Sequence, residues 1–443
     1  MRRIFGAYAY GAGPRTNCWW DETCGLPRVP AISGPETADV AVIGGGFTGL
    51  SAAHALARAG VDVVLLEAME IGWGASGRNG GFCCLGGAVA EDAELDARYG
   101  KAARLTFRAA EVAAVAHVEH FVDTHALVVD RHSKGETELA HRPGEMVSLR
   151  ARVTQIQENY GVTPSLIEQD QLAAHGFGGG PFYGALTIPV GFGLNPRKYH
   201  AGLLTEVRAE GVRIFAGSPV ERVASTSRGH VLHCAKGKVT ASDVVIATNA
   251  YSSENVPDWL AGRYMPAQSN VLVTRPMTEQ ELEAQGWTTP QMSYDTRNLL
   301  HYFRLMPDRR FLFGMRGGLT SGAAAEAASR RRIRRDFERM FPAWQHVDVT
   351  HMWSGMVSLA RDKIPFVGAI PHANGLWTAM CYHGNGVAMG SYAGRLIADQ
   401  VLGHDAENCP QIMRKPLARF PLGSGRRALM PPVYAKLMLG DRF

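Results

Sequence analysis

A short apolar run followed by a helical pattern near the amino terminus predicts a β-strand, a turn and an α-helix in immediate succession. Residues 40–43 have the character of a buried strand, and residues 50–59 have that of a helix. A second apolar run, which predicts another strand, ends at Glu67. The order of strand, turn, helix, strand and terminal acid is that of a nucleotide-binding βαβ unit.

Three glycines occupy the turn between the strand and the helix, with the spacing G-x-G-x-x-G. Gly44 permits the tight turn, Gly46 lets a pyrophosphate approach the backbone, and Gly49 lets the helix pack closely on the strand. The first helical residues, Phe47 and Thr48, offer free N–H groups to a phosphate. We therefore predict that these five residues bind the cofactor.

Glu67 indicates which dinucleotide is bound. It lies 23 positions after Gly44. Its carboxylate can accept both ribose hydroxyls of an adenosine but would repel a 2′-phosphate, so FAD or NAD is favoured over NADP. The glycine spacing alone is weak evidence, because Gly72, Gly74 and Gly77 repeat it without a preceding strand or a following helix.

The segment after Glu67 indicates a flavin. Residues 70–83, EIGWGASGRNGGFC, stand where another simple βα repeat would otherwise begin. In these residues the sequence resembles the D-amino-acid oxidase and glycine/sarcosine oxidase superfamily of FAD-dependent amine oxidoreductases. Within it, G-A-S-G-R-N-G-G is most similar to the γ-glutamylputrescine oxidase group. The resemblance implies that this segment runs beside the pyrophosphate and ribityl chain, with contacts at Ser76, Arg78, Asn79 and Gly80.

Two later segments extend the resemblance. Residues 213–223 and 238–252 have the pattern of short strands that would enlarge the FAD-binding domain. The resemblance implies that the backbone at Val220 holds the adenine and that Asn249 lies near the pyrophosphate.

The last motif, GLWTAMCYHGNGVAMGSYAGRLIAD at residues 375–399, predicts a strand, a glycine turn and a helix from about Gly386. A helix N-terminus near the flavin would stabilise the negative charge of the reduced ring by about 0.3 to 1 kcal/mol. We predict cofactor contacts at Gly384, Asn385 and Gly386. The superfamily commonly has S-G-H-G here, so His383 remains open between facing the flavin or substrate and being satisfied within a turn.

The chain of 443 residues exceeds what one core usually supports, so two domains are expected. We predict an α/β fold with an α+β substrate part: a Rossmann-type FAD-binding domain assembled from discontinuous segments, and a substrate domain on an antiparallel sheet. The predicted segments are an N-terminal arm (1–35), the FAD-binding domain (36–90, 190–263 and 345–410), the substrate domain (91–189 and 264–344) and a C-terminal tail (411–443).

Two basic residues are candidates for the substrate site. Arg316, in the predicted strand FLFGMRGG, lies where sarcosine-oxidase relatives carry a basic residue over the flavin. It would clamp a carboxylate in a bidentate pair or activate oxygen. Lys363 follows in a stretch that resembles the superfamily's return to the FAD-binding domain, and a salt-bridged surface turn is the alternative.

The strand predicted at residues 299–305 offers a further choice. Tyr302 and Arg304 alternate onto one face, whereas His301 and Phe303 take the other. One pair is expected to face the pocket, and the sequence leaves open which. Tyr302 and His301 are therefore both candidates for catalytic roles.

The resemblance implies an FAD-dependent oxidase of a small amine or amino acid. A hydride leaves the carbon next to nitrogen for flavin N5, the imine hydrolyses, and O2 is reduced to H2O2. We expect a carboxylated amine, an N-substituted glycine such as iminodiacetate or sarcosine. The alternatives are γ-glutamylputrescine, a dehydrogenase with a protein electron acceptor, and an FAD-binding assembly or sensor protein without turnover.

Composition narrows the partners and the location. The net charge of +5 comes without a lysine-rich tail, which argues against nucleic acid. No apolar run reaches about 18 residues, so no transmembrane segment is expected.

Seven cysteines without a disulfide framework indicate the cytoplasm. Cys18 and Cys24 lack the further ligands of a metal site. No covalent attachment motif is evident, so we expect noncovalent FAD. The oligomeric state stays open.

Overall fold

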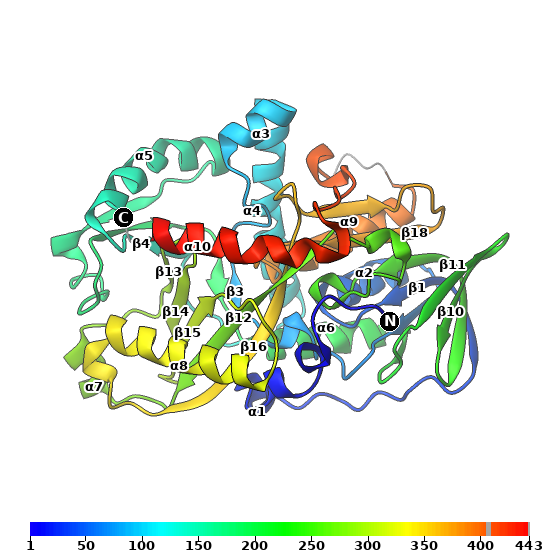
Figure 1. Cartoon of the computed structure of the whole chain (residues 1–443), viewed down its shortest axis with the longest axis horizontal. Helices are drawn as coiled ribbons and strands as arrows, with labels where there is room; N and C mark the ends of the chain where they lie inside the picture. Colours follow the sequence, from blue (N-terminus) through cyan, green and yellow to red (C-terminus); the bar gives the residue numbers. More distant parts are fainter. Residues whose placement is uncertain (405–408, 442–443) are drawn as a thin grey trace.

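The computed structural model describes residues 1–404 and 409–441. The chain forms two large β-sheets, each flanked by helices, which lie side by side in Figure 1. The predicted segments 345–410 and 411–443 include residues 405–408 and 442–443, which lie outside the described residues. The mixed α/β architecture predicted from the sequence is confirmed.

The first sheet contains the predicted nucleotide-binding strands. Residues 40–43 pair in parallel with residues 63–66 on one side and with residues 243–246 on the other. These apolar strands are buried on both faces, which is typical of a parallel sheet covered by helices. In spatial order the strands are β17 (Phe366–Ala369), β18 (Leu376–Met380), β11 (Gly237–Ile246), β1 (Pro35–Ile43), β2 (Val63–Leu66) and β8 (Arg213–Phe215), and the hairpin of β9 (Arg222–Thr226) and β10 (Gly229–Cys234) pairs with β11.

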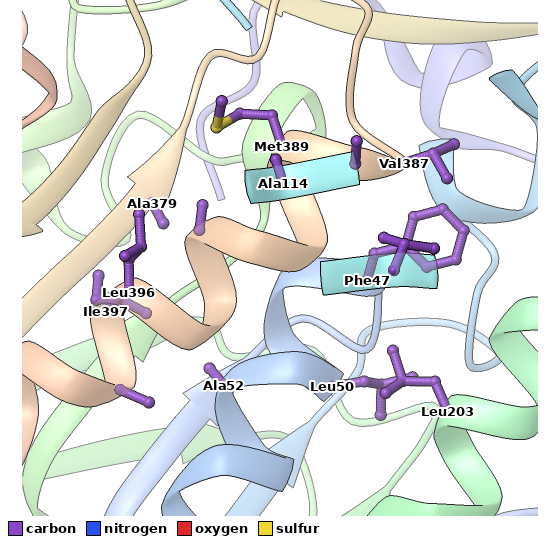
Figure 2. Close-up of a cluster of buried hydrophobic side chains, with 14 of the residues drawn as sticks. Phe47, Leu50, Ala52, Ala114, Leu203, Ala379, Val387, Met389, Leu396 and Ile397 are labelled. Atoms are coloured by element: carbon purple, nitrogen blue, oxygen red, sulfur yellow. The ribbon is translucent and has the colours of Figure 1, made fainter. Parts of the chain in front are cut away.

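A large hydrophobic core joins one face of this sheet to the helices beside it (Figure 2). Phe47 and Leu50 lie close to Leu203, while Met389 and Leu396 belong to the helix that packs against the same cluster. The glycine motif therefore lies at the edge of a well-packed core, which fixes its position. The helices that contribute are α2 (Phe47–Arg58), α4 (Lys101–Thr124), α6 (Pro196–Ala209) and α9 (Ala388–Val401), and α3 (Asp92–Tyr99) packs on α4.

The second sheet provides the predicted substrate domain with its framework. All of its pairings are antiparallel except one parallel pair, between residues 136–139 and 292–295. Residues 349–359 pair with residues 265–274 in this sheet, although the sequence prediction put residues 345–410 in the FAD-binding domain. In order the strands are β16 (Val349–Leu359), β12 (Met265–Thr274), β15 (Phe311–Arg316), β14 (His301–Leu305), β13 (Met292–Asp295), β4 (Glu136–Leu139), β6 (Gly184–Ile188) and β5 (Ser165–Glu168).

One face of this second sheet is closed by an aromatic core. Phe303 and Phe313 point toward Phe337, Phe341 and Trp344, all of which are fully buried. The opposite face, which carries Tyr302, points away from this core. The remaining elements are α8 (Ala323–Met340) and α7 (Glu279–Gln285) at this core, α5 (Pro143–Tyr160), the small sheet of β3 (Phe82–Cys83) and β7 (Phe192–Gly193), α1 (Trp20–Thr23) and α10 (Met430–Gly440).

Both terminal segments pack on the body of the molecule. In the N-terminal segment, the Trp20 indole N–H donates to the Asn79 carbonyl over 2.8 Å. In the C-terminal segment, buried Arg426 pairs with Glu254 at 2.8 Å and donates to the Tyr264 carbonyl. In Figure 1, α10 crosses in front of the second sheet.

Across residues 1–404 and 409–441, no helix is long and apolar enough to cross a membrane. The predicted division into domains stays a prediction.

Candidate active site

A cavity of about 910 Å³ extends from the first sheet to the second. One part is lined by the glycine motif, Glu67 and Val220, and another by strands of the second sheet, including Tyr302 and Arg316. Among the exposed residues of the lining are Met69, close to Glu67, and Gln155 on α5. The cavity therefore reaches the surface in two places and joins the two predicted sites.

The glycine turn has the close contacts that its sequence predicts. Gly44 has a φ of +112°, which disfavours other residues. A Cβ atom on Gly49 would lie 1.8 Å from the Gly44 carbonyl oxygen, so the packing of α2 on β1 requires glycine there. A Cβ on Gly46 would lie 2.8 Å from Ser76 Oγ. Gly44 and Gly46 line the cavity with Phe47, the first residue of α2, so the N-terminus of this helix lies at the cavity.

Glu67 lines this part of the cavity directly after β2. Its carboxylate oxygens accept hydrogen bonds from the Gly45 N–H at 2.7 Å and the Met69 N–H at 2.9 Å. Burial raises its pKa, and these backbone donors oppose the shift. Thr48 connects α2 to α9, because its hydroxyl bonds the Gly390 carbonyl oxygen at 2.8 Å. Both residues line the cavity.

The loop at residues 76–80 presents an unpartnered donor to the cavity. Arg78 is 2% exposed, and its Nε donates to the Trp73 carbonyl at 2.9 Å. Its Nη2 has no hydrogen-bond partner among the described residues. Burial lowers the pKa of Arg78. Ser76 Oγ accepts from the Phe47 N–H at 2.9 Å, and Asn79 closes the loop through its donation to the Ser76 carbonyl at 2.8 Å. All three line the cavity with Gly80.

The turn before α9 brings the two parts of the cavity together. Arg316 Nη2 donates to the His383 carbonyl at 3.1 Å, and a Cβ on Gly384 would lie 2.8 Å from the same nitrogen. Asn385 donates to the Leu85 carbonyl and lines the cavity with Gly384 and Gly386. The predicted flavin turn and the predicted substrate arginine are thus in direct contact.

Val220 and Asn249 also line the part of the cavity formed by the first sheet. Val220 is buried, and Asn249 Oδ1 accepts a hydrogen bond from the Cys381 N–H at 3.0 Å. The asparagine side chain therefore connects the turn after β11 to the turn before α9. This leaves its backbone as the group that can meet a ligand.

The second sheet turns the face with Tyr302 toward the cavity. Tyr302 lines the cavity, and its hydroxyl lies 2.9 Å from Ser269 Oγ on β12. A Cβ on Gly80 would lie 2.7 Å from the Tyr302 ring, so this tyrosine packs on the cofactor loop. Arg304 shares this face but donates to the Leu194 carbonyl at 2.8 Å. Of the two strand faces that the sequence left open, the one that carries Tyr302 lines the cavity.

Two residues predicted to be catalytic, His301 and Lys363, lie outside the cavity lining. His301 faces the aromatic core, where its Nδ1 lies 2.9 Å from Asp295. Lys363 pairs with Glu94 at 3.0 Å and is about half exposed. Their predicted roles lack support, because neither lines the cavity and each is paired with a carboxylate.

His383 is satisfied within the turn. Its Nδ1 donates to the Gly87 carbonyl at 2.8 Å, and its Nε2 accepts from the Ala360 N–H at 3.0 Å. Burial lowers its pKa to about 4, so the neutral ring is favoured. The sequence left open whether His383 faces the flavin or substrate or is satisfied within a turn. The hydrogen bonds of the structure favour the second interpretation.

Sequence reasoning missed several residues of the cavity wall. Ser269, Tyr294, Cys84 and Glu136 line it from β12, β13, the segment after β3, and β4. In the short strand ETEL, Glu136 and Glu138 share one face, which is therefore polar. Nothing in the sequence indicated that this face meets a ligand.

The residues of the first part of the cavity fit FAD. Free helix N–H groups, close glycine backbone and a carboxylate at the end of β2 are the features that a dinucleotide requires. The unpartnered Nη2 of Arg78 adds a donor for an acceptor atom of the cofactor.

Comparisons with known proteins agree with this geometry. A family model described as FAD dependent oxidoreductase matches residues 39–400. The chain is 30% identical over 428 residues to the probable oxidoreductase OrdL of Rhizobium meliloti (strain 1021), covering 96% of this chain and 97% of that protein. It is 31% identical over 412 residues to the gamma-glutamylputrescine oxidoreductase of Escherichia coli (strain K12), covering 89% and 90%.

The fold is similar to that of glycine oxidase from Geobacillus kaustophilus. The crystal structure of that enzyme matches with a TM-score of 0.71 over 86% of this chain and 100% of the other, at 19% sequence identity. The likeness supports the arrangement of the two sheets.

Proposed function

The chain belongs to the family of FAD-dependent oxidoreductases, and we propose that it oxidises the C–N bond of an amine or amino acid that carries a carboxylate. The predicted family and the predicted cofactor are thereby confirmed. The observation that carries the substrate proposal is Arg316, a cation in the cavity wall that forms no ion pair within residues 1–404 and 409–441.

Arg316 is suited to bind an anion. The Nη2 atom donates only to the His383 carbonyl, and the side chain also touches the glycine turn before α9. Burial lowers its pKa, yet an arginine stays protonated in proteins. A carboxylate that accepts two parallel hydrogen bonds would satisfy two of the four remaining N–H donors. Because Arg316 contacts Gly384, that carboxylate would be bound beside the flavin end of the cofactor site.

The chain's other residues prepare the amine for oxidation. FAD, when bound, supplies the acceptor for the hydride that leaves the carbon next to nitrogen. Only a neutral amine can release that hydride readily, and burial against an apolar wall lowers an amine's pKa. Leu300 and Tyr302 offer such a wall in this cavity. The N-terminus of α9 favours the negative charge that develops on reduction.

The length of the cavity favours a second candidate for the substrate. A small N-substituted glycine, such as iminodiacetate or sarcosine, needs only Arg316 and the flavin end. The cavity continues along the second sheet to Tyr294 and Glu136. This extra length supports a longer substrate such as γ-glutamylputrescine, whose carboxylate would lie with its α-ammonium at the far end of the cavity instead of on Arg316, and the similarity to gamma-glutamylputrescine oxidoreductase points the same way.

The proposal is tested by anaerobic flavin absorbance. The FAD-loaded protein is mixed with iminodiacetate, sarcosine, glycine, D-alanine and γ-glutamylputrescine in turn, and air is then admitted. We expect a carboxylated amine to bleach the flavin, with recovery and peroxide formation in air. Bleaching without recovery in air would indicate a dehydrogenase with a protein acceptor. Failure of every amine to bleach a fully loaded flavin would contradict the proposal.

A further inference from the structure

The cavity continues beyond Tyr302 to a buried carboxylate on β4. Glu136 lines the cavity, and the residue is 4% exposed. Residues paired across a sheet share a face, and Tyr302 pairs with Tyr294, which pairs with Glu138. Glu136 lies two positions before Glu138, so it belongs to the same face as Tyr302.

The neighbouring carboxylates each have an arginine. Glu111 is held by Arg108 at 2.9 and 3.1 Å and by the Tyr160 hydroxyl at 2.9 Å. The same arginine binds Asp92 at 2.7 Å. Glu138 is paired with Arg152. These groups are therefore satisfied within the protein.

Glu136 differs from these neighbours. Its carboxylate takes part in no ion pair in the part of the chain that the structure describes. The Cys84 thiol, a weak donor, is hydrogen-bonded to it. The pKa of Glu136 is raised to about 8, chiefly by burial and also by the charges of Glu138 and Glu111, while the Cys84 hydrogen bond and Arg152 oppose the shift. Burying a carboxylate without a cation is costly, and a cationic ligand in the cavity would remove that cost.

We propose that Glu136 binds a second cationic group of the substrate, an ammonium or guanidinium at the end remote from the C–N bond that is oxidised. This inference rests on the proposed function, because that function brings an amine substrate into the cavity. The substrate class is thereby narrowed to extended amines or amino acids with two nitrogen cations. Glu91, which also lines the cavity, adds a negative charge that favours the entry of a cation.

The dimensions agree with an extended substrate. Three strand spacings separate β15, which carries Arg316, from β4, or about 14 Å between backbones. In γ-glutamylputrescine ten bonds join the two amine nitrogens, which span roughly 12 Å when extended. Sarcosine is much too short to reach Glu136 from the flavin end.

Two matched ligand pairs test the proposal. Each pair differs by one charge: γ-glutamylputrescine against N-glutarylputrescine, which lacks the α-ammonium, and arginine against citrulline. Dissociation constants are measured by calorimetry on FAD-loaded protein whose flavin has been reduced, so that no ligand is oxidised. We expect the wild type to bind the charged member of at least one pair about tenfold to a hundredfold more tightly. Glu136→Gln is expected to abolish that ratio.

Controls separate this role from a general charge effect. Glu138→Gln removes the same charge from the same strand but from a group paired with Arg152, so it is expected to keep most of the ratio. Sarcosine should bind equally to the wild type and to Glu136→Gln, and thermal melting confirms that both variants fold. Equal ratios in the wild type and Glu136→Gln, or no preference in either pair, would overturn the inference. The bleaching experiment decides the proposed function independently of this result.

Discussion

The two sheets of this protein recognise ligands in different ways. Around β1 and α2, recognition depends on the backbone, because Gly44, Gly46 and Gly49 remove side chains where contacts are closest. On the second sheet it depends on single charged side chains such as Arg316. On the proposed function, the first region would determine whether the cofactor binds, whereas the second would determine which molecule reacts.

The carboxylates of the two regions illustrate the difference. Glu67 accepts hydrogen bonds from two backbone N–H groups, so its charge is stabilised before any ligand binds. Among the described residues, Glu136 has no such backbone donor and is left with the Cys84 thiol. A group satisfied by the backbone supports the fold, whereas a buried group without a partner indicates a missing ligand.

The largest effect is expected at the backbone of the first region. Gly49→Ala places a Cβ 1.8 Å from the Gly44 carbonyl oxygen, so α2 must move away from β1. We expect loss of FAD binding and a melting temperature lowered by several degrees, measured by flavin content and thermal melting. Gly144→Ala, in α5 with no atom within 4 Å of the new Cβ, is the matched control and should retain both. Full FAD content in Gly49→Ala would contradict the account.

The next largest effect is expected at the substrate arginine. Arg316→Met should leave FAD bound and raise KM for a carboxylated substrate by about tenfold or more, because a hydrogen bond to a charged group contributes about 1.5 to 3 kcal/mol. Steady-state kinetics measure this change, and Arg316→Lys should recover part of it. Arg331→Met, at an exposed position on α8, serves as the control. An unchanged KM in Arg316→Met would exclude the carboxylate role.

A smaller effect is expected at Tyr302. The variant Tyr302→Phe keeps the ring on Gly80 but removes the hydroxyl bonded to Ser269. The loss of one neutral hydrogen bond, about 1 kcal/mol, predicts a change in kcat/KM of about fivefold. Ser269→Ala should have a similar effect, and the double variant should add little. Additive losses would show that the two groups act separately.

The unpaired carboxylate predicts a dependence of stability on pH. The pKa of Glu136 is raised to about 8 in the folded protein, whereas an unfolded glutamate titrates near about 4.3. Folded protein therefore keeps this proton to higher pH, and its contribution to stability is lost as pH rises from about 4 to about 8. Glu136→Gln should melt a few degrees above the ligand-free wild type at pH 8. The difference should shrink toward pH 5, and a constant difference would contradict the assignment.

The smallest effect is expected at Lys363. Its ion pair with Glu94 is partly exposed and lies outside the cavity. Surface pairs of this kind contribute about 0 to 1 kcal/mol to stability. Lys363→Ala should therefore leave kcat/KM unchanged in steady-state assays, with at most a small fall in melting temperature. A large fall in kcat would restore the catalytic role considered from the sequence.

The cofactor region was largely predictable from the sequence because its motif is local. The glycines of the turn, the apolar strands and Glu67 lie within residues 39–67 and carry their geometry in their spacing. The loop contacts at Ser76, Arg78, Asn79 and Gly80 followed from the resemblance, and these four residues line the cavity with Gly384.

The substrate region was less predictable because its residues are far apart in the chain. Glu136 comes to the same sheet face as Tyr302 only through the pairing of β4 with β13 and of β13 with β14. Strand alternation separated Tyr302 from His301 but could not say which face is closed by Phe337. The pairing of β16 with β12, about 80 residues away in the chain, could not be predicted for the same reason.

The most direct measurement is a crystal structure of the FAD-loaded protein with an unreactive analogue of the substrate, in which oxygen replaces the reacting nitrogen. Diglycolate is such an analogue of iminodiacetate. The account predicts that the carboxylate lies within about 2.7 to 2.9 Å of the Arg316 guanidinium, beside the turn at Gly384. A carboxylate bound elsewhere, with Arg316 still facing an empty cavity, would contradict the assignment of the substrate site to the second sheet.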